Sequence, residues 1–387
     1  MIDSISNEYK IILYRISQII NGGKSLVDSQ LLSVEAEHSE ANPEEMSQFS
    51  LQKSEEGSLY AERIATVAKK HMIDIMLGQD SQKSKWQAVL MSEERERLAG
   101  LLEAAGIDYR FLKGSIWCKL YPNPYMRQMM DCDILTADDA KITTKVADIL
   151  LADGYERKKS GCDNHEVFFK RPVYEVEVHR SLFDEKDEPK LYSYFSTGLW
   201  QNGKDGKLPK WSAGMEFLYM LAHHYKHFSC GEMGIRHLID IYLYERKYSN
   251  LYDEEWLQRE LENLNIGRFA SDIRELAHKV FNNEHELLSD KQKEMLDHIC
   301  DSGVFGSYES RVRGKLMTQD TKTVGQAKRK YLFKRIFPPI GYYEKNAPFC
   351  FRHRWAIPFF WIYRVFRILF ARRSRLKTEL QTLHRKD

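Results

Sequence analysis

The sequence predicts an α+β fold, in which a small mixed sheet flanked by helices is followed by a helical domain. Short apolar runs between residues 107 and 180 are typical of strands, and helical periodicity dominates after residue 210. In addition, two carboxylates one residue apart, Asp131 and Asp133, lie in one of the strand-like runs. The 387 residues, 43% of them hydrophobic, are enough for two domains and a sizeable core.

The composition narrows the class of protein. A net charge of +2 excludes a chain that binds polyanions over its whole surface. The six cysteines are scattered without a CxxC pair, which indicates a reducing, intracellular compartment. The N-terminus lacks the features of a signal peptide, and no apolar run reaches the roughly 18 residues of a membrane span. We therefore expect a cytoplasmic location.

Residues 1–83 are predicted to be an N-terminal helical and linker region. The apolar spacing favours helices over residues 5–20 and 57–77. Between them, residues 21–56 contain Gly22-Gly23, Pro43 and several glutamates, which indicates an irregular linker.

Residues 84–210 are predicted to be the α/β core. A helix that ends at Ala105-Gly106 opens it, and a hairpin around Arg171-Pro172 follows later. The predicted elements are helices over 84–104, 116–121 and 137–152, strands over 107–112, 129–136, 165–170 and 174–180, and a turn at 113–115.

The rest of the chain is predicted to be helical up to about residue 330, with a basic, aromatic tail over 331–387. Residues 311–329 are basic and contain few large apolar side chains, which favours a loop. The predicted helices cover 212–228, 233–248, 253–264, 267–281 and 288–301.

Asp131 and Asp133 are the first candidate site residues. Side chains at i and i+2 of a strand point to the same face, so the two carboxylates would lie side by side. Such carboxylates repel each other, and a divalent cation between them removes the repulsion. Mg²⁺ typically takes one or two protein carboxylates together with substrate phosphates.

A larger set of motifs accompanies this pair in a fixed order. The motifs are Leu112-Lys113-Gly114, Arg127, Asp131-Cys132-Asp133-Ile134-Leu135, Gly154-Tyr155, Glu177-Val178-His179, His224 and Asp240. The chain resembles the DNA polymerase beta-like nucleotidyltransferases, and more closely the bacterial group of uncharacterised nucleotidyltransferases. The resemblance covers about residues 95–250, and more weakly Phe337-Pro338-Pro339.

The resemblance implies a nucleotidyltransferase sheet and transfer of a nucleoside monophosphate from an NTP to an acceptor. Asp131, Asp133 and Glu177 would be catalytic and would bind Mg²⁺ or Mn²⁺, with Glu175 on the same face as an alternative third carboxylate. The acceptor stays open between a small molecule, a sugar, a protein and an RNA end. The residues implied in nucleotide binding are Lys113, Gly114, Ser115, Arg127, His224 and Asp240.

Several of these residues have a structural alternative. Lys113 would contact a phosphate or lie at a solvated edge, and Arg127 would steady the triphosphate or orient Asp131. His179 would support the metal ligands or be purely structural. His224 and Asp240 would face the nucleotide, or form a buried hydrogen bond between two helices.

Two further features stay open. His223 and His227 have the i, i+4 spacing of zinc enzymes, but neither the glutamate of His-Glu-x-x-His nor a third ligand is present, so zinc is not favoured. The stretch 351–377 has seven arginines, one lysine and no acid among aromatic residues. It fits peripheral contact with an anionic inner-membrane surface, or docking on the helical domain. A non-catalytic scaffold and a toxin-like transferase acting on tRNA or protein are the alternative functions.

Overall fold

The chain is represented by a computed structural model that has the predicted mixed α+β architecture. It describes residues 7–21, 66, 69–73, 80–159, 164–172, 174–201, 207–284, 287–319, 323–338, 340–371, 379 and 381–382. The predicted linker 21–56, apart from its first residue, lies outside the described residues, as does most of the predicted helix 57–77.

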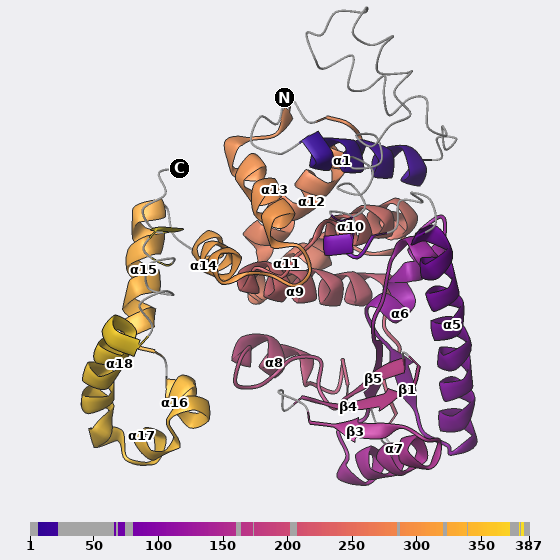
Figure 1. Ribbon diagram of the computed structural model, residues 1–387, viewed down its shortest axis with the longest axis horizontal. Helices are drawn as coiled ribbons and strands as arrows, with labels where there is room; N and C mark the ends of the chain where they lie inside the picture. The colour runs from indigo at the N-terminus through magenta and orange to yellow at the C-terminus, as the bar shows by residue number, and fades with distance from the viewer. Residues whose placement is uncertain are drawn as a thin grey trace, which may run out of the picture.

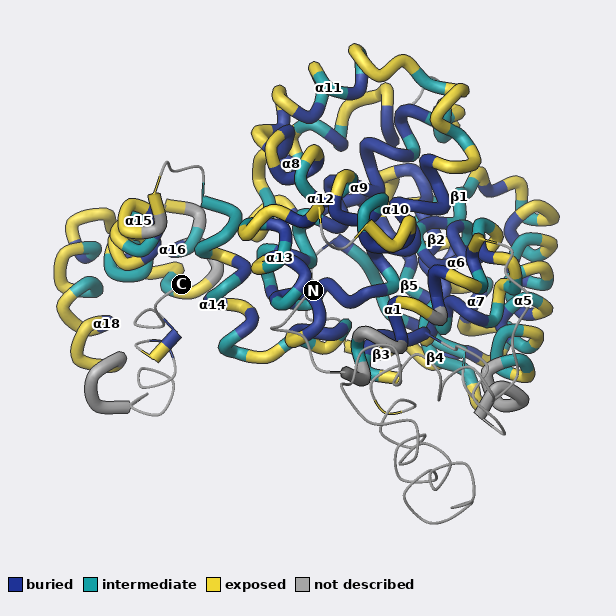
Figure 2. Tube along the Cα trace, turned by 90° about the horizontal axis from the view of Figure 1, so that it is seen from above, coloured by how far each residue is buried: buried dark blue, intermediate teal, exposed yellow. Residues whose placement is uncertain are grey.

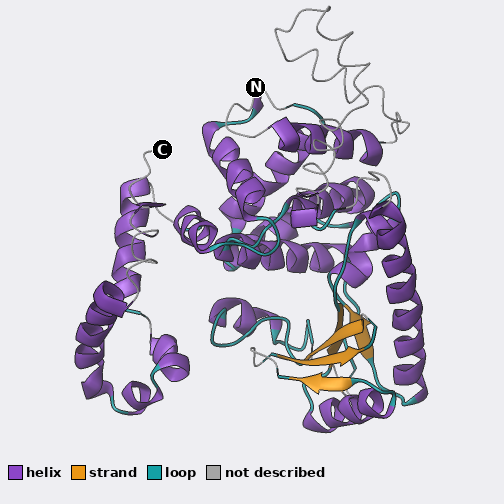
Figure 3. Cartoon of the chain, in the orientation of Figure 1, coloured by secondary structure: helices purple, strands orange, loops and turns teal. Residues whose placement is uncertain are grey.

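Within the described residues, five short strands form one mixed sheet (Figure 3), with the order β1-β2-β5-β4-β3. β2 and β5 run parallel, and the other neighbours run antiparallel. Four strands confirm the sequence prediction, whereas β3 was not predicted because its three residues are all exposed and lack an apolar face. The strands are β1 (Tyr109–Phe111), β2 (Cys132–Thr136), β3 (Glu156–Lys158), β4 (His165–Lys170) and β5 (Tyr174–His179).

Two helices cover one face of this sheet (Figure 1): α5 (Asp80–Ala104) and α7 (Ala140–Ala152). The strand residues that pack with them are all buried: Cys132, Ile134, Phe168, Val176 and Val178. Because side chains alternate along a strand, Asp133, Glu177 and His179 lie on the opposite face. The apolar packing thus fixes which face of the sheet carries the polar residues.

The second half of the chain is a layer of helices that shares the main core cluster with Leu112 and Leu135 of the sheet region. All five helices predicted up to residue 301 are confirmed. They are α9 (Ala213–Cys230), α10 (Ile235–Tyr248), α11 (Glu254–Asn263), α12 (Gly267–Phe281) and α13 (Asp290–Ser302). The N-terminal helix α1 (Asn7–Ile20) joins this layer, since the Ser17 hydroxyl donates to the Phe281 carbonyl at 2.6 Å.

Short helical pieces connect the main elements. The segment after β1 is helical from Gly114, so the turn predicted at 113–115 is the start of a helix. The pieces are α6 (Gly114–Trp117), α8 (Pro189–Phe195) and single 3₁₀ turns at Cys118–Leu120, Pro124–Met126 and Ser249–Leu251.

The prediction of a loop over residues 311–329 is wrong, because α14 (Tyr308–Met317) and α15 (Val324–Ile336) include most of these residues. A capping box between Ser307 and Ser310 starts α14. Gly314 then lets α14 pack against the end of α9, where an added Cβ would meet the Phe228 carbonyl oxygen at 2.2 Å. Close backbone packing therefore replaces the large apolar side chains whose scarcity favoured a loop.

The C-terminal helices form an arm beside the rest of the molecule (Figures 1 and 2). They are α16 (Ile340–Asn346), α17 (Pro348–Arg352), a 3₁₀ turn (Arg354–Ala356) and α18 (Ile357–Ala371). Over the described part of the chain, no helix combines the length and apolarity needed to cross a bilayer. The division at residues 83, 210 and 330 stays a prediction.

Candidate active site

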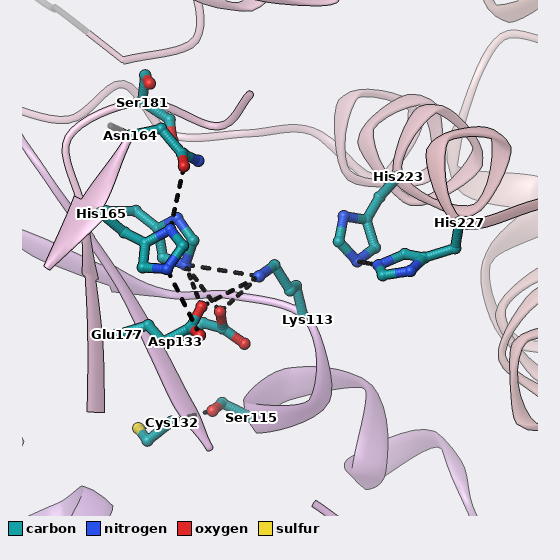
Figure 4. Close-up of polar contacts among 11 residues, drawn as sticks. Lys113, Ser115, Cys132, Asp133, Asn164, His165, Glu177, Ser181, His223 and His227 are labelled. Atoms are coloured by element: carbon teal, nitrogen blue, oxygen red, sulfur yellow. Dashed lines mark hydrogen bonds and ion pairs between the residues drawn. The ribbon is translucent and has the colours of Figure 1, made fainter. Parts of the chain in front are cut away.

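Three carboxylates meet on the polar face of the sheet. Asp131 directly precedes β2, Asp133 lies in β2, and Glu177 is the register partner of Asp133 on the parallel neighbour β5. Each offers an oxygen that lies within 4.8 Å of the others, close enough to share a metal ion. The predicted pair therefore gains its third carboxylate from the adjacent strand (Figure 4 shows Asp133 and Glu177).

Glu175, the alternative third carboxylate, lies elsewhere. Its side chain forms an ion pair with Lys158 of β3 at 2.8 Å and is about one-third exposed. It does not belong to the carboxylate group that Glu177 completes among the described residues.

Lys113 points its ammonium group into this cluster (Figure 4). Its Nζ lies 2.5 Å from Asp133 Oδ1 and 3.9 Å from Glu177 Oε2. Lys113 adopts φ 51° and ψ −126°, a region that L-residues rarely occupy, at a cost of roughly 1–3 kcal/mol. The helix start holds this conformation, since the amides of Ile116 and Trp117 both donate to the Lys113 carbonyl. Lys113 is therefore the counter-ion of Asp133 rather than a solvated edge residue.

The two aspartates have opposite protonation behaviour. Burial and the neighbouring Asp133 raise the pKa of Asp131 to about 6. Burial alone would raise the pKa of Asp133 as well, but the Lys113 ammonium and the hydrogen bond with His179 hold it well below its usual range. Lys113 therefore favours the charged form of Asp133, whereas burial and the neighbouring Asp133 disfavour the charged form of Asp131.

This arrangement predicts that metal-free protein loses stability as pH rises through the Asp131 transition. The Asp131 carboxyl has a pKa of 3.8 when unperturbed and about 6 in the folded chain, so the folded state binds the extra proton between these values. Asp131→Asn should therefore stabilise metal-free protein by about 1–3 kcal/mol at pH 7 and by almost nothing at pH 4. Urea unfolding with a chelator at both pH values measures this difference, and an equal change at both would contradict it.

Two histidines complete the polar cluster on the sheet. His179 of β5 donates a hydrogen bond from its Nε2 to Asp133 Oδ1 at 2.8 Å, and the same Nε2 lies 3.3 Å from Glu177 Oε2. His165 of β4, the antiparallel register partner of His179, places Nε2 3.6 Å from Glu177 Oε1. His165 was not predicted as a site residue; its place opposite His179 in the hairpin was the available signal.

Gly114 and Ser115 open α6 beside this cluster. A Cβ at Gly114 would lie 2.7 Å from Arg127 Nη1, so glycine is needed here for the close approach of the guanidinium. The Ser115 amide donates to the Leu112 carbonyl, and its buried hydroxyl contacts Cys132 Sγ at 3.6 Å. Their assigned contact with phosphate stays a prediction.

Arg127 and Asp240 form a buried ion pair between the sheet region and α10. The guanidinium Nε and Nη2 each donate to one oxygen of Asp240 at 2.8 Å, and Tyr121 Oη donates to Oδ1 at 2.9 Å. Arg127 thus pairs with Asp240 rather than with Asp131. The predicted alternative, a hydrogen bond between His224 and Asp240, is wrong, because His224 Nε2 and Asp240 Oδ2 are 3.8 Å apart.

His223 and His227 face the cluster from α9 (Figure 4). Their Nε2 atoms are 3.1 Å apart, and burial, which disfavours the charged ring, lowers the pKa of both well below the usual value. One neutral ring therefore donates to the other. Among the residues with described placement, neither histidine belongs to a group of three metal-ligating side chains.

Comparison with known proteins places the sheet region in a family. Residues 67–282 match the model of a family described as uncharacterised nucleotidyltransferase, which covers the sheet, the carboxylates, and the helices up to α12. The C-terminal arm lies outside this match. No curated protein and no solved structure matches the chain.

Proposed function

The chain belongs to the uncharacterised nucleotidyltransferase family, and we propose that it transfers a nucleoside monophosphate from an NTP to an acceptor in a Mg²⁺- or Mn²⁺-dependent reaction of the polymerase beta-like kind. The observation that carries the proposal is the convergence of Asp131, Asp133 and Glu177 within 4.8 Å on one sheet face. The family supports nucleotidyl transfer; the metal dependence is our inference from the three carboxylates.

The residues fit a divalent cation. The donor set is all carboxylate oxygen, which Mg²⁺ prefers. Burial, followed by the negative charge of Asp133, raises the pKa of Asp131, and a bound cation would favour its charged form. Asp131, Asp133 and Glu177 would hold the ion or ions. When bound, such ions stabilise the attacking and leaving oxygens of a displacement at phosphorus.

The reaction joins an acceptor oxygen to the α-phosphorus and breaks the bond between that phosphorus and the bridging oxygen to the β-phosphate, so pyrophosphate leaves. Glu177, with an oxygen facing away from Asp133 towards His165, would take the proton of an acceptor hydroxyl. Lys113 would turn from Asp133 to the nucleotide phosphates once a metal neutralises the carboxylates. This exchange of partners requires a long, flexible cationic side chain.

The other nucleotide-binding residues follow from their places around Lys113. Gly114 and Ser115 begin the helix next to it. Asp240 holds Arg127 in place, and the Arg127 guanidinium packs closely against Gly114. We propose that these residues, with His224 behind them, form the wall against the triphosphate. The acceptor is a small molecule, a sugar, a protein or an RNA end.

Calorimetry with each NTP in the presence and absence of Mg²⁺ tests the proposal. We expect nucleotide binding that requires the metal and that is lost in Asp131→Asn/Asp133→Asn. A screen of labelled NTPs in lysate, with the same double variant as control, then identifies the acceptor class and separates RNA from protein targets. Nucleotide binding that is independent of both metal and aspartates would sink the proposed function.

A second proposal concerns the C-terminal arm, which we propose contacts an anionic membrane surface. Four α18 side chains at i, i+3, i+4 and i+7 are more than half exposed: Phe359, Ile362, Tyr363 and Phe366. Trp355 is 68% exposed beside them, and arginines at 352, 354 and 367 are exposed as well. An aromatic stripe flanked by arginines is typical of helices that lie in the interface of anionic lipids. A non-catalytic scaffold function would use the same surface.

Not all arginines of the arm point outwards. Arg364 is 7% exposed, donates to the Arg335 carbonyl at 2.8 Å and lies over the Tyr342 ring. It holds α18 against α15, and this packing orients the aromatic stripe away from that helix.

Flotation with vesicles tests the membrane contact. The full chain should bind vesicles that contain phosphatidylglycerol and not vesicles of phosphatidylcholine alone, because the arginines require anionic lipid. Phe359→Glu/Ile362→Glu should reduce binding at least about tenfold, since both changes place charge in the apolar interface. The same pair of glutamates at the exposed positions Leu251 and Leu287 is the control, and equal flotation of both variants and the wild type would count against the contact.

A further inference from the structure

The polar face of the sheet carries a second group of metal-ligating side chains, formed by His165, Glu177 and His179. His165 and His179 are opposite each other in the β4–β5 hairpin, and Glu177 lies two residues before His179 on the same strand face. One ligand atom of each residue lies within 4.8 Å of the others. The imidazole rings are 4.9 Å apart between centroids.

The hydrogen bonds around His165 decide which of its ring nitrogens is free. Asn164 Nδ2 donates to the Ser181 carbonyl at 3.3 Å, which can only accept, so the Asn164 oxygen must face His165 Nδ1 at 3.0 Å. His165 Nδ1 therefore carries a hydrogen, and the neutral ring presents the lone pair of Nε2 towards Glu177 Oε1 (Figure 4). A histidine that ligates a metal characteristically has its other nitrogen fixed in this way.

Two acceptors then face each other. The Nε2 atom of His165 and the Glu177 carboxylate oxygen Oε1 are 3.6 Å apart, an arrangement that a cation between them would stabilise. Two ligands about 2.1 Å from a tetrahedral metal are roughly 3.4 Å apart. The separation of 3.6 Å agrees with this value. His179 Nε2 lies 3.3 Å from Glu177 Oε2, and a metal bound there would replace the hydrogen that Nε2 donates to Asp133.

We propose that His165, Glu177 and His179 form a second metal site, which binds a divalent transition-metal ion. Imidazole nitrogen favours transition metals such as Mn²⁺, Co²⁺ or Zn²⁺, whereas Mg²⁺ prefers oxygen ligands. Glu177 links this site to the carboxylate site, because its Oε1 faces His165 and its Oε2 faces Lys113 and His179. The inference goes beyond the proposed function, since metal binding here requires neither nucleotide nor transfer.

Titration of the chelator-treated full chain with Co²⁺, without nucleotide, tests the site. Calorimetry gives the affinity, and the visible absorption of Co²⁺ reports nitrogen ligation. We expect His165→Ala to weaken Co²⁺ binding at least about tenfold, and Asn164→Ala, which leaves all three ligands in place, to weaken it about tenfold to a hundredfold. Mg²⁺ binding in the presence of an NTP should be unchanged by Asn164→Ala.

His353→Ala is the matched control, because this histidine is exposed on the C-terminal arm. Circular dichroism melting shows whether each variant is folded. If His165→Ala does not fold, Asn164→Ala still tests the site. Co²⁺ binding that is unchanged in both variants, or that depends on His223 instead, overturns the proposal. A lack of NTP transfer would overturn the proposed function without changing the Co²⁺ titrations. Failure of the proposed function can therefore be distinguished from failure of the metal-site proposal.

Discussion

Glu177→Gln is expected to reduce nucleotidyl transfer by about a thousandfold, equivalent to about 4 kcal/mol of transition-state stabilisation. The change removes the charge that completes the carboxylate group while keeping the size of the side chain. It also removes the base proposed for the acceptor hydroxyl. Initial rates with a saturating NTP, measured once the acceptor is known, give the loss.

Glu175→Gln is the matched control for this variant. Glu175 lies on the same strand and the same face, two residues away, but it pairs with Lys158 and is about one-third exposed. Its replacement should change the rate less than about threefold, since an exposed ion pair contributes at most about 1 kcal/mol. If Glu175→Gln instead abolishes transfer and Glu177→Gln does not, the third carboxylate has been assigned to the wrong residue.

Arg127→Ala is expected to destabilise the protein by about 3–5 kcal/mol, because it breaks a buried ion pair and leaves one charge in the core. Arg127 and Asp240 are both almost fully buried. Among the described residues, removal of the guanidinium leaves Tyr121 as the one hydrogen-bond donor to the buried Asp240 carboxylate. The pair also joins the sheet region to α10. The free energy of unfolding from urea titration measures the loss.

Arg157→Ala provides the comparison on the surface. Arg157 pairs with Glu166 between β3 and β4, but its side chain is about half exposed, so its loss should cost less than about 1 kcal/mol. In Arg127→Ala/Asp240→Ala the total loss should be smaller than the sum of the single losses, since no charge is left buried alone. An Arg127→Ala variant as stable as the wild type would contradict the part assigned to this ion pair in joining the sheet region to α10.

The local elements were predictable because their signals are local. The strands β1, β2, β4 and β5 and the five helices from 213 to 302 lie where apolar periodicity placed them. The exposed strand β3 and the helix α14 were missed for the same physical reason. β3 has no apolar face, and α14 has only a sparse one, formed by Tyr308, Val312 and Leu316. Hydrogen bonding to β4 holds β3, and close backbone contact with α9 helps to hold α14.

For the site as well, the sequence identified the residues themselves but not the residues that they contact. Asp131, Asp133 and Glu177 were identified from the order of motifs, and the register between β2 and β5 brings their carboxylates together. The partners of the site residues were not identifiable. Arg127 lies four residues from Asp131 yet pairs with Asp240, which is more than a hundred residues away.

The sequence by itself determined the α+β class, the positions of β1, β2, β4 and β5, and the carboxylates at Asp131 and Asp133, because alternation and turn residues act over a few positions. Only the tertiary structure decided that Glu177 rather than Glu175 lies beside them, and that Lys113 is the counter-ion of Asp133. It also placed His165 against Glu177. Strand register and buried charge pairing decide these contacts, and both depend on residues far apart in the chain. For that reason the two carboxylates were visible in the sequence, and their electrostatic surroundings were not.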